Sequence, residues 1–170
     1  YTHQDKTSTI KGINMTTLYH GSHENTAPVI KIGFAAFLPA DNVFDGIFAN
    51  GDKNVARSHG DFIYAYEVDS IATNDDLDCD EAIQIIAKEL YIDEETAAPI
   101  AEAVAYEESL AEFEEHIMPR SCGDCADFGW EMQRLRGVIA RKLGFDAVEC
   151  VDEHGVSHLI VNANIRGSIA

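Results

Sequence analysis

The chain has 170 residues, and its 12 lysines and arginines against 30 acidic residues give a formal net charge of −18. This length fits one domain with a single core, and no segment approaches the ~20 consecutive apolar residues that a membrane-spanning helix needs. Direct binding to DNA or RNA is disfavoured, because a strongly negative protein repels nucleic-acid phosphates. Residues 1–14 are polar and precede Met15. We interpret them as a leader or cloning remnant, and residues 15–170 as a single cytoplasmic domain.

The first part of the chain predicts short strands. Residues 16–20 suit one strand, and residues 21–45, which contain two prolines, predict an irregular loop that could lie over a ligand. Residues 46–49 and 62–68 predict two further strands, because they are rich in β-branched and aromatic residues. The polar segment 50–59 between them suits a short helix.

Two helices are indicated by apolar residues at helical spacing. One covers residues 80–91, with Asp80 as the candidate N-cap, and the other covers residues 127–143. Gly144 follows directly and is expected to end the second helix.

A third helix is predicted between them, at residues 94–117. Proline is tolerated in the first turn of a helix, so Pro99 predicts a start near Thr96. The negative charge is concentrated in this region, because 17 acidic residues and one lysine lie between Glu67 and Glu115. This acidic segment is either a solvated helical face or a surface that docks on a basic partner, such as a nucleic-acid-binding protein.

The end of the chain predicts a β-hairpin. Residues 145–151 and 156–161 alternate apolar and polar side chains, and Asp-Glu-His-Gly separates them. Strands at both ends with helices gathered between them indicate an α+β fold and argue against a wound βαβ repeat.

The four cysteines predict neither a disulfide framework nor a metal site. No secretory segment accompanies them, so reduced thiols are the default. Cys122 and Cys125 have the spacing of a zinc or redox half-site, but a structural zinc needs four ligands and no second closely spaced pair is present. We therefore expect a loop with incidental thiols and no bound metal.

Two motifs near the N-terminus carry a resemblance to a known family. Thr-Leu-Tyr-His-Gly-Ser at residues 17–22 ends an apolar strand in a histidine and a tight glycine turn, and Asp-Gly-Ile-Phe-Ala-Asn follows at residues 45–50. In this order, and followed by the strand at residues 62–68, the motifs resemble the NAD-binding half of the ADP-ribosyltransferases. The resemblance implies an ADP-ribosyltransferase-like split β-sheet core with an acidic helical insert, and NAD as co-substrate.

The resemblance also implies roles for individual residues. In this family the strand-borne histidine bonds a ribose hydroxyl, the following glycine backbone pairs with the nicotinamide amide, and aromatic residues pack on the ring. Carried over by motif, these cofactor-binding roles fall to His20, Gly21 with Ser22, and Phe48 with Tyr64. Alternatively, His20 is an ordinary edge-strand histidine and the two aromatic residues are plain core. Tyr19 alternates with His20 and is expected to face the other side of the sheet as packing.

The motifs name the cofactor-binding residues but do not identify the catalytic carboxylate directly. Cleavage of the nicotinamide–ribose bond passes through an oxocarbenium-like state, which a nearby carboxylate stabilises. Many relatives carry a glutamate at the start of the final strand, but residues 157–160 contain no acid. The candidates are Asp152 and Glu153 at the hairpin, and Glu131 or Asp127 at the start of the last helix. Such acids can also be only turn formers or partners of a helix dipole. Asp152 is the preferred assignment.

Four further segments point to one group within the ADP-ribosyltransferases. The acidic segment, Trp-Glu-Met-Gln at residues 130–133, Leu-Gly-Phe at residues 143–145 and the hairpin turn are similar to small phage anti-CRISPR ADP-ribosyltransferases that inactivate a type I surveillance complex. The similarity covers about residues 16–162. It implies transfer of ADP-ribose from NAD to a side chain of a basic host protein, a CRISPR-associated subunit, inside the host cell.

Two other functions compete with this hypothesis. The first is a non-catalytic acidic nucleic-acid mimic that blocks a basic groove on a nucleic-acid-binding protein. The second is an RNA 2′-phosphotransferase of similar fold, which is disfavoured because the chain has only 12 lysines and arginines to clamp an RNA.

Overall fold

Two sheets carry the N-terminal and C-terminal parts of the chain in the computed structural model, which describes residues 15–33, 44–122, 125–126, 128–152 and 155–170. The three-stranded sheet has the order β1-β3-β9, formed by β1 (Thr16–Ser22), β3 (Phe62–Val68) and β9 (Ser168–Ile169). The four-stranded sheet has the order β2-β8-β7-β4, formed by β2 (Ile47–Ala49), β8 (Gly155–Ile160), β7 (Ala147–Asp152) and β4 (Ile71–Ala72). Within it, β7 and β8 form the predicted hairpin, and the short β4 runs parallel to β7.

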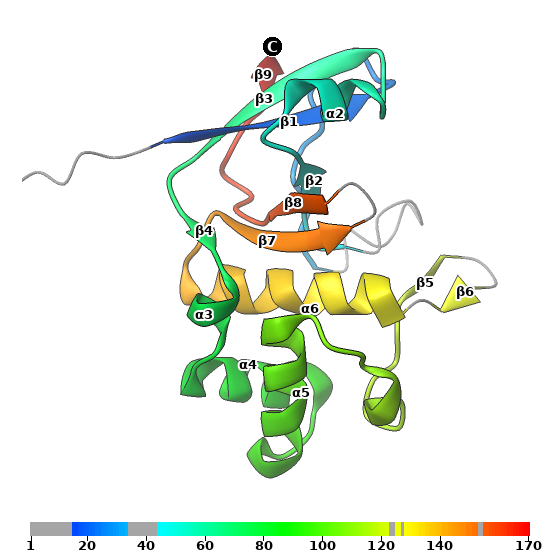
Figure 1. Ribbon diagram of the computed structural model, residues 1–170, viewed down its shortest axis with the longest axis vertical. Helices are drawn as coiled ribbons and strands as arrows, with labels where there is room; N and C mark the ends of the chain where they lie inside the picture. The colour runs from blue at the N-terminus through cyan, green and yellow to red at the C-terminus, as the bar shows by residue number, and fades with distance from the viewer. Residues whose placement is uncertain (1–14, 34–43, 123–124, 127, 153–154) are drawn as a thin grey trace, which may run out of the picture.

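The helices are layered below these sheets. In Figure 1 the three-stranded sheet lies at the top with α2 (Lys53–Arg57), and α6 (Phe128–Leu143) runs beneath the hairpin of the second sheet. The helices α4 (Asp80–Leu90) and α5 (Glu94–Tyr106) lie on the far side of α6, and the short α3 (Asn74–Leu77) packs beside α6. A short 3-10 turn, Ala111–Phe113, and the two-stranded pair β5 (Ser121–Cys122) and β6 (Cys125–Ala126) connect α5 to α6. The α+β class predicted from the sequence is confirmed.

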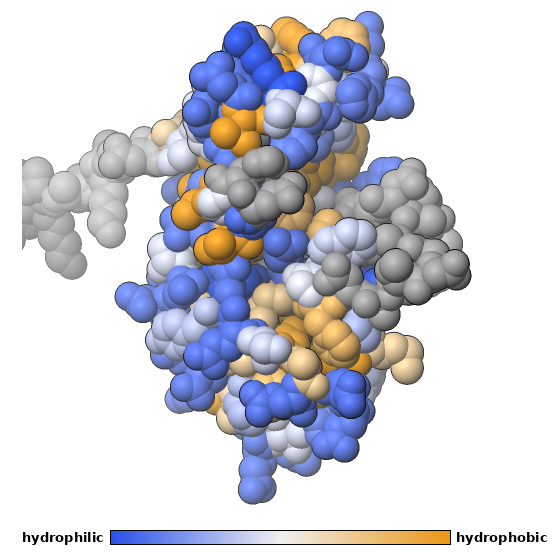
Figure 2. Space-filling model, turned by 45° about the vertical axis from the view of Figure 1, so that its right-hand side comes forward, coloured by the Kyte–Doolittle hydropathy of each residue, from blue (hydrophilic) through white to orange (hydrophobic). Residues whose placement is uncertain are grey.

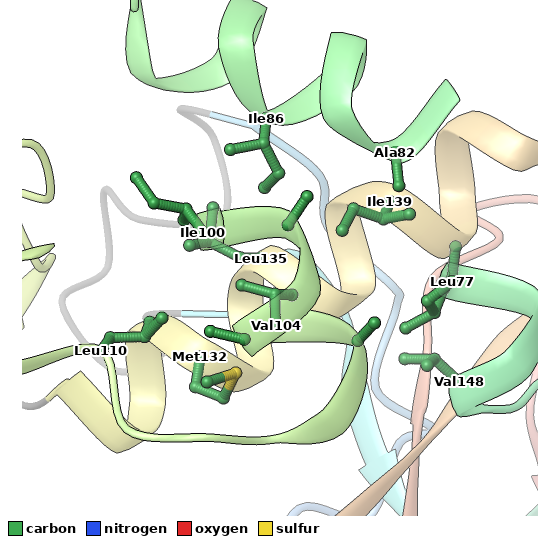
Figure 3. Close-up of a cluster of buried hydrophobic side chains, with 14 of the residues drawn as sticks. Leu77, Ala82, Ile86, Ile100, Val104, Leu110, Met132, Leu135, Ile139 and Val148 are labelled. Atoms are coloured by element: carbon green, nitrogen blue, oxygen red, sulfur yellow. The ribbon is translucent and has the colours of Figure 1, made fainter. Parts of the chain in front are cut away.

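The larger hydrophobic cluster lies where the helices meet each other and the four-stranded sheet. Ile86 of α4, Ile100 of α5, Leu135 and Ile139 of α6, and Val148 of β7 are all fully buried there (Figure 3). Complete burial of one such side chain contributes about 1.5 to 3 kcal/mol relative to exposure. The helical layer is therefore anchored to the hairpin through α6, and this fixes the position of the strand ends next to it.

The helix predicted at residues 94–117 is shorter than expected. It begins at Glu94, with the Asp93 carboxylate accepting a 2.8 Å hydrogen bond from the Thr96 amide, and it ends at Tyr106. Pro99 thus lies in the second turn, and the predicted start near Thr96 is wrong. Helical spacing of apolar residues continues beyond Tyr106, but Leu110 reaches the core from an irregular connection instead.

Several other element boundaries differ in detail. Cys79, and not Asp80, occupies the N-cap of α4. The predicted end of the last helix is confirmed, because Gly144 follows Leu143 with φ of 93°, a conformation that few other residues adopt. The short elements β4, α3 and β9 carry too few residues for a periodic signal and were not predicted. Within the described part of the chain, no helix has both the length and the apolar character to cross a membrane.

Candidate active site

A cavity of about 740 Å³ is lined by residues of both sheets and of the first turns of α6. Pockets of this size hold cofactors and small-molecule substrates in other proteins. The residues that line it on the β1 and α2 side are Tyr19, His20, Gly21, Val55, Ala56 and His59. The remaining lining residues are Phe44, Phe48, Ala49, Asn50, Glu107, Gly129, Trp130, Met132, Gln133, Val151, Asp152 and Ser157. The cavity therefore joins segments that are up to 138 positions apart, from Tyr19 to Ser157.

His20 is held at the cavity in one tautomer. Its Nδ1 lies 2.7 Å from the carbonyl oxygen of Phe48, and because a carbonyl can only accept, Nδ1 carries the proton and donates it. Burial lowers the pKa of His20 below its ordinary value of 6.5, and the nearby His59 acts in the same direction, against the Phe48 hydrogen bond. At neutral pH the ring is uncharged, and Nε2 is a hydrogen-bond acceptor that suits a hydroxyl group.

Gly21 is required by the close approach of α2 to β1. A Cβ atom built on Gly21 would lie 1.9 Å from the carbonyl oxygen of Ala56, which is backbone and cannot rotate away. A Cβ on Gly60 would likewise lie 2.3 to 2.5 Å from backbone atoms of Ser22. The family resemblance predicts Gly21 as a cofactor-binding residue. The structure shows in addition that packing against α2 requires glycine at this position.

Asn50, the last residue of the second motif, links the two sheets. Its backbone exchanges two 2.8 Å hydrogen bonds with Tyr19, and its side-chain amide donates to the carbonyl of Val156 in β8. The side-chain oxygen of Asn50 also accepts from the Asp52 amide at the start of α2. Tyr19 lines the cavity in addition to His20, although the sequence placed it on the other face as packing. Lys53 Nζ lies 5.9 Å from the centre of the Tyr19 ring.

Three aromatic side chains line another part of the cavity. The Phe44 ring lies edge-on to Phe48, with centroids 4.8 Å apart, and edge-on to Trp130, with centroids 6.2 Å apart. Edge-to-face pairs of this kind stabilise by about 0.5 to 1.5 kcal/mol beyond area burial. Phe48 was predicted from the sequence, but Phe44 and Trp130 were not. Trp130 reaches the cavity because α6 packs beside the motif at residues 45–50. Trp130 is the single tryptophan of the chain.

Among the residues with a described placement, two carboxylates line the cavity, Asp152 at the end of β7 and Glu107 directly after α5. Asp152 is half-buried and is paired with Gly155 across the hairpin. Sequence analysis named Asp152 as the preferred carboxylate and missed Glu107, because nothing in the local pattern indicates that α5 ends beside the hairpin. Among the residues that the structure describes, no cluster of three His, Cys, Asp or Glu side chains is arranged to hold a metal ion.

Glu131, another candidate for the catalytic carboxylate, is buried in an ion pair with Arg134. Its side chain is 2% exposed and accepts hydrogen bonds from Arg134, the shortest of which is 2.6 Å. Arg134 also pairs with Glu89 of α4 at 2.6 Å, so the pair joins α6 to the helical layer. Glu131 is absent from the lining of the cavity, although its neighbours Trp130 and Met132 belong to it.

The remaining predicted residues are absent from the cavity lining or fall outside the described part. The Ser22 hydroxyl accepts from the Glu24 amide, and the hydroxyl of Tyr64, which is 4% exposed, donates to the Glu24 carbonyl. Neither residue lines the cavity, so both support the end of β1. Glu153 and Asp127 fall outside the described residues.

The two cysteines with described side chains lie away from the cavity wall. Burial raises the pKa of the Cys150 thiol to about 12, so this residue stays protonated at neutral pH. Cys79 is partly exposed at the start of α4. Neither is placed to act as a nucleophile in the cavity.

Together, the fold and the cavity define an α+β protein in which a histidine, aromatic rings and the carboxylates of Glu107 and Asp152 line one cavity. The chain belongs to the anti-CRISPR type I-F ADP-ribosyltransferase family AcrIF11, whose family model matches residues 16–168. The fold is similar to a solved structure titled as the crystal structure of an anti-CRISPR protein, with a TM-score of 0.62 and 28% sequence identity. That match covers 92% of this chain and 96% of the other. No curated protein sequence gives a significant match. The resemblance described from the sequence motifs is confirmed.

Proposed function

We propose that the protein transfers ADP-ribose from NAD to a side chain of a CRISPR-Cas protein, in the cytoplasm of a phage-infected bacterium. The observation that carries this proposal is the single cavity that contains His20, Gly21 and Asp152, in a chain whose family is named for ADP-ribosyl transfer. Other observations bear on the binding of NAD, on the chemistry and on the target.

Several groups at or near the cavity are chemically suited to parts of an NAD molecule, which supports the proposal. With Nδ1 of His20 hydrogen-bonded to Phe48, Nε2 remains as an acceptor for a ribose hydroxyl, and Gly21 contributes to the cavity wall, where its backbone could pair with the nicotinamide amide. Phe48 and Trp130 provide apolar surface for a ring. Lys53 does not line the cavity itself, but its Nζ lies 5.9 Å from the ring centre of Tyr19, which does, and it is our candidate cation for the pyrophosphate.

In the transfer, the bond between the ribose C1′ and the nicotinamide nitrogen breaks, and its electron pair leaves with neutral nicotinamide. A lone pair of the target side chain forms the new bond to C1′, and the proton of that side chain passes to solvent. Positive charge develops on the ribose as the bond breaks. We assign its stabilisation to the Asp152 carboxylate, because such preorganised charge is usually the largest catalytic contribution.

The acidic segment between Glu67 and Glu115 supports a basic target. It forms α3, α4 and α5 and the connection that follows, and it holds 17 acidic residues against Lys88 alone. Figure 2 shows hydrophilic residues spread around the helical half of the molecule, with a smaller apolar area between them. A surface of this charge speeds association with a positively charged surface, such as one that binds nucleic acid.

The high negative charge also favours a second candidate, the non-catalytic nucleic-acid mimic. A mimic would inhibit without NAD and would not depend on residues of the cavity. The test is to incubate the protein with a type I surveillance complex and isotopically labelled NAD, and to follow nicotinamide release and the mass of each subunit. We expect a gain of one ADP-ribose on one subunit, abolished by His20→Ala and by Asp152→Asn.

The matched control is Asp61→Asn, which makes the same chemical change at a side chain that is 84% exposed and outside the cavity. It is expected to behave as the wild type. Inhibition that persists without NAD and in the His20→Ala protein would support the mimic and overturn the transferase proposal.

A further inference from the structure

The outer edge of β7 is covered by a strand along only part of its length. β4 pairs with Ala147 and Val148, and in the part of the chain that the structure describes no strand continues along the rest of this edge. Alternate residues of a strand present their backbone groups to the same edge. The carbonyl of Glu149 and the amide of Val151 therefore both face outward, immediately before Asp152.

Two side chains occupy this edge in place of a strand. The Glu107 carboxylate accepts from the Val151 amide at 2.9 Å, and the Arg136 guanidinium donates to the Glu149 carbonyl at 2.8 and 3.0 Å. The two side chains also form an ion pair, with 3.5 Å between Arg136 Nη2 and Glu107 Oε1. Val151 is exposed and the bonds to the Glu149 carbonyl are partly buried, so the pair supplies protein partners to backbone groups that water would otherwise have to satisfy.

The same pair joins this edge to the end of α5. Arg136 is fully buried and donates to the carbonyls of Val104 and Ala105, at 2.8 and 2.7 Å, in the last turn of the helix. The last carbonyls of a helix lack partners within it, and a cation beside them is favourable. The last residues of β7 are thus attached to the helical layer through one guanidinium and one carboxylate.

The backbone conformation of Glu107 makes glycine an informative substitution. Glu107 has φ of 57° and ψ of 36°, the left-handed conformation that glycine or asparagine usually occupies after a helix. A glutamate is strained in this conformation, as is Tyr91 at the end of α4, so the conformation alone does not assign a function. Glycine would relieve the backbone strain, but it would leave the Val151 amide without its acceptor.

We propose that Glu107 is a positioning residue that holds the end of β7 so that Asp152 faces the reacting ribose. This inference rests on the proposed transferase function. Glu107 acts through Val151, the residue directly before Asp152, and its own carboxylate lines the same cavity. Displacement of a catalytic group by about 1 Å can lower the rate by about a hundredfold, so a single side-chain anchor is sufficient for a large effect.

The test compares Glu107→Gly, which removes the anchor and relieves the backbone strain, with Glu107→Gln, which keeps an oxygen acceptor for the Val151 amide. The matched control is Glu108→Gln, which removes the same charge from the next residue, an exposed one. In the presence of a type I surveillance complex as acceptor, we measure nicotinamide release for kcat and KM. We also measure NAD binding from Trp130 fluorescence and hydrogen exchange of the Val151 amide by NMR. Circular dichroism verifies that each variant is folded.

For Glu107→Gly we expect kcat to fall by about tenfold to a hundredfold, while KM and the affinity for NAD change by less than about threefold. Exchange of the Val151 amide should accelerate by about tenfold, as expected for loss of a hydrogen bond to a charged acceptor. Glu107→Gln should restore most of kcat and of the amide protection, and Glu108→Gln should leave both unchanged.

Three results would overturn the proposal: an unchanged kcat in folded Glu107→Gly, a loss confined to KM, or unchanged exchange at Val151. A loss confined to KM would mean that Glu107 contacts NAD directly. If the wild-type protein releases no nicotinamide, the transferase function itself fails. In that case the Val151 exchange rate still reports whether Glu107 holds the strand.

Discussion

Replacement of Asp152 and of Glu131 by the corresponding amides is expected to have opposite effects. Asp152→Asn changes a charge at the cavity wall without changing the shape of the side chain. A unit charge about 5 Å from the developing positive charge, in an effective dielectric of about 20, contributes roughly 3 kcal/mol. This corresponds to a loss in kcat of somewhat more than a hundredfold. Because Asp152 is half-buried and its replacement is isosteric, we expect the stability to change by less than about 1 kcal/mol.

Glu131→Gln removes one partner of a buried ion pair. The side chains of Glu131 and Arg134 are 2% and 5% exposed. After the change, the buried positive charge of Arg134 is paired, among the described residues, only with the Glu89 carboxylate. Breaking such a pair costs about 3 to 5 kcal/mol, and we expect the lower end because Glu89 remains. For a chain of this size that is a fall in melting temperature of roughly 6 to 12 °C.

The assay measures kcat for nicotinamide release well below both melting temperatures, alongside thermal unfolding of each variant. Folded Glu131→Gln should keep most of its activity, and Asp152→Asn should lose activity at an almost unchanged melting temperature. The assignment would be refuted by the reverse pattern: Asp152→Asn with more than about a tenth of wild-type kcat, or Glu131→Gln with a normal melting temperature and little activity.

Three further predictions concern the β1 and α2 side of the cavity. Burial lowers the pKa of His20 below 6.5, so below that pH the folded protein binds fewer protons than the unfolded chain. The stability contributed by the neutral ring is therefore complete above about pH 6.5 and is lost as the pH falls toward the pKa of His20 in the folded protein. The urea midpoint of unfolding should drop on acidification. An equal drop in the His20→Gln protein would contradict this prediction. Gly21→Ala places a Cβ atom 1.9 Å from a backbone oxygen of α2 and should destabilise by about 3 kcal/mol, whereas Gly51→Ala, with no atom within 4 Å, should be almost neutral in the same unfolding experiment. Lys53→Met should raise KM for NAD by about fivefold with kcat unchanged, as for loss of one exposed ion pair; an unchanged KM would exclude Lys53 from pyrophosphate binding.

Local sequence patterns were sufficient for several of the longer elements. The strand at residues 62–68 was predicted from its β-branched and aromatic residues, and α6 from apolar residues at helical spacing. Both signals extend over only a few residues. The end of α5 did not follow in the same way. Apolar residues continue at helical spacing past Tyr106, and only packing against β7 shows why the chain turns at Glu107.

The candidate site was predictable where a motif is contiguous. His20, Gly21 and Phe48 came from two short motifs, and all three line the cavity. Trp130 and Glu107 were missed, because each enters the cavity from a segment more than 50 residues from either motif. The order of residues along the chain carries no direct signal for such a contact.

By itself the sequence determined the α+β class, the concentration of negative charge, the two motifs of the family and a short set of candidate carboxylates. Only the tertiary structure decided the tautomer of His20, the placement of Asp152 at the cavity and the burial of Glu131 against Arg134. The physical reason is one of range. Strand and helix periodicities are set by neighbouring residues, whereas burial, hydrogen-bond partners and charge pairing depend on side chains that only the packing of the whole chain brings together.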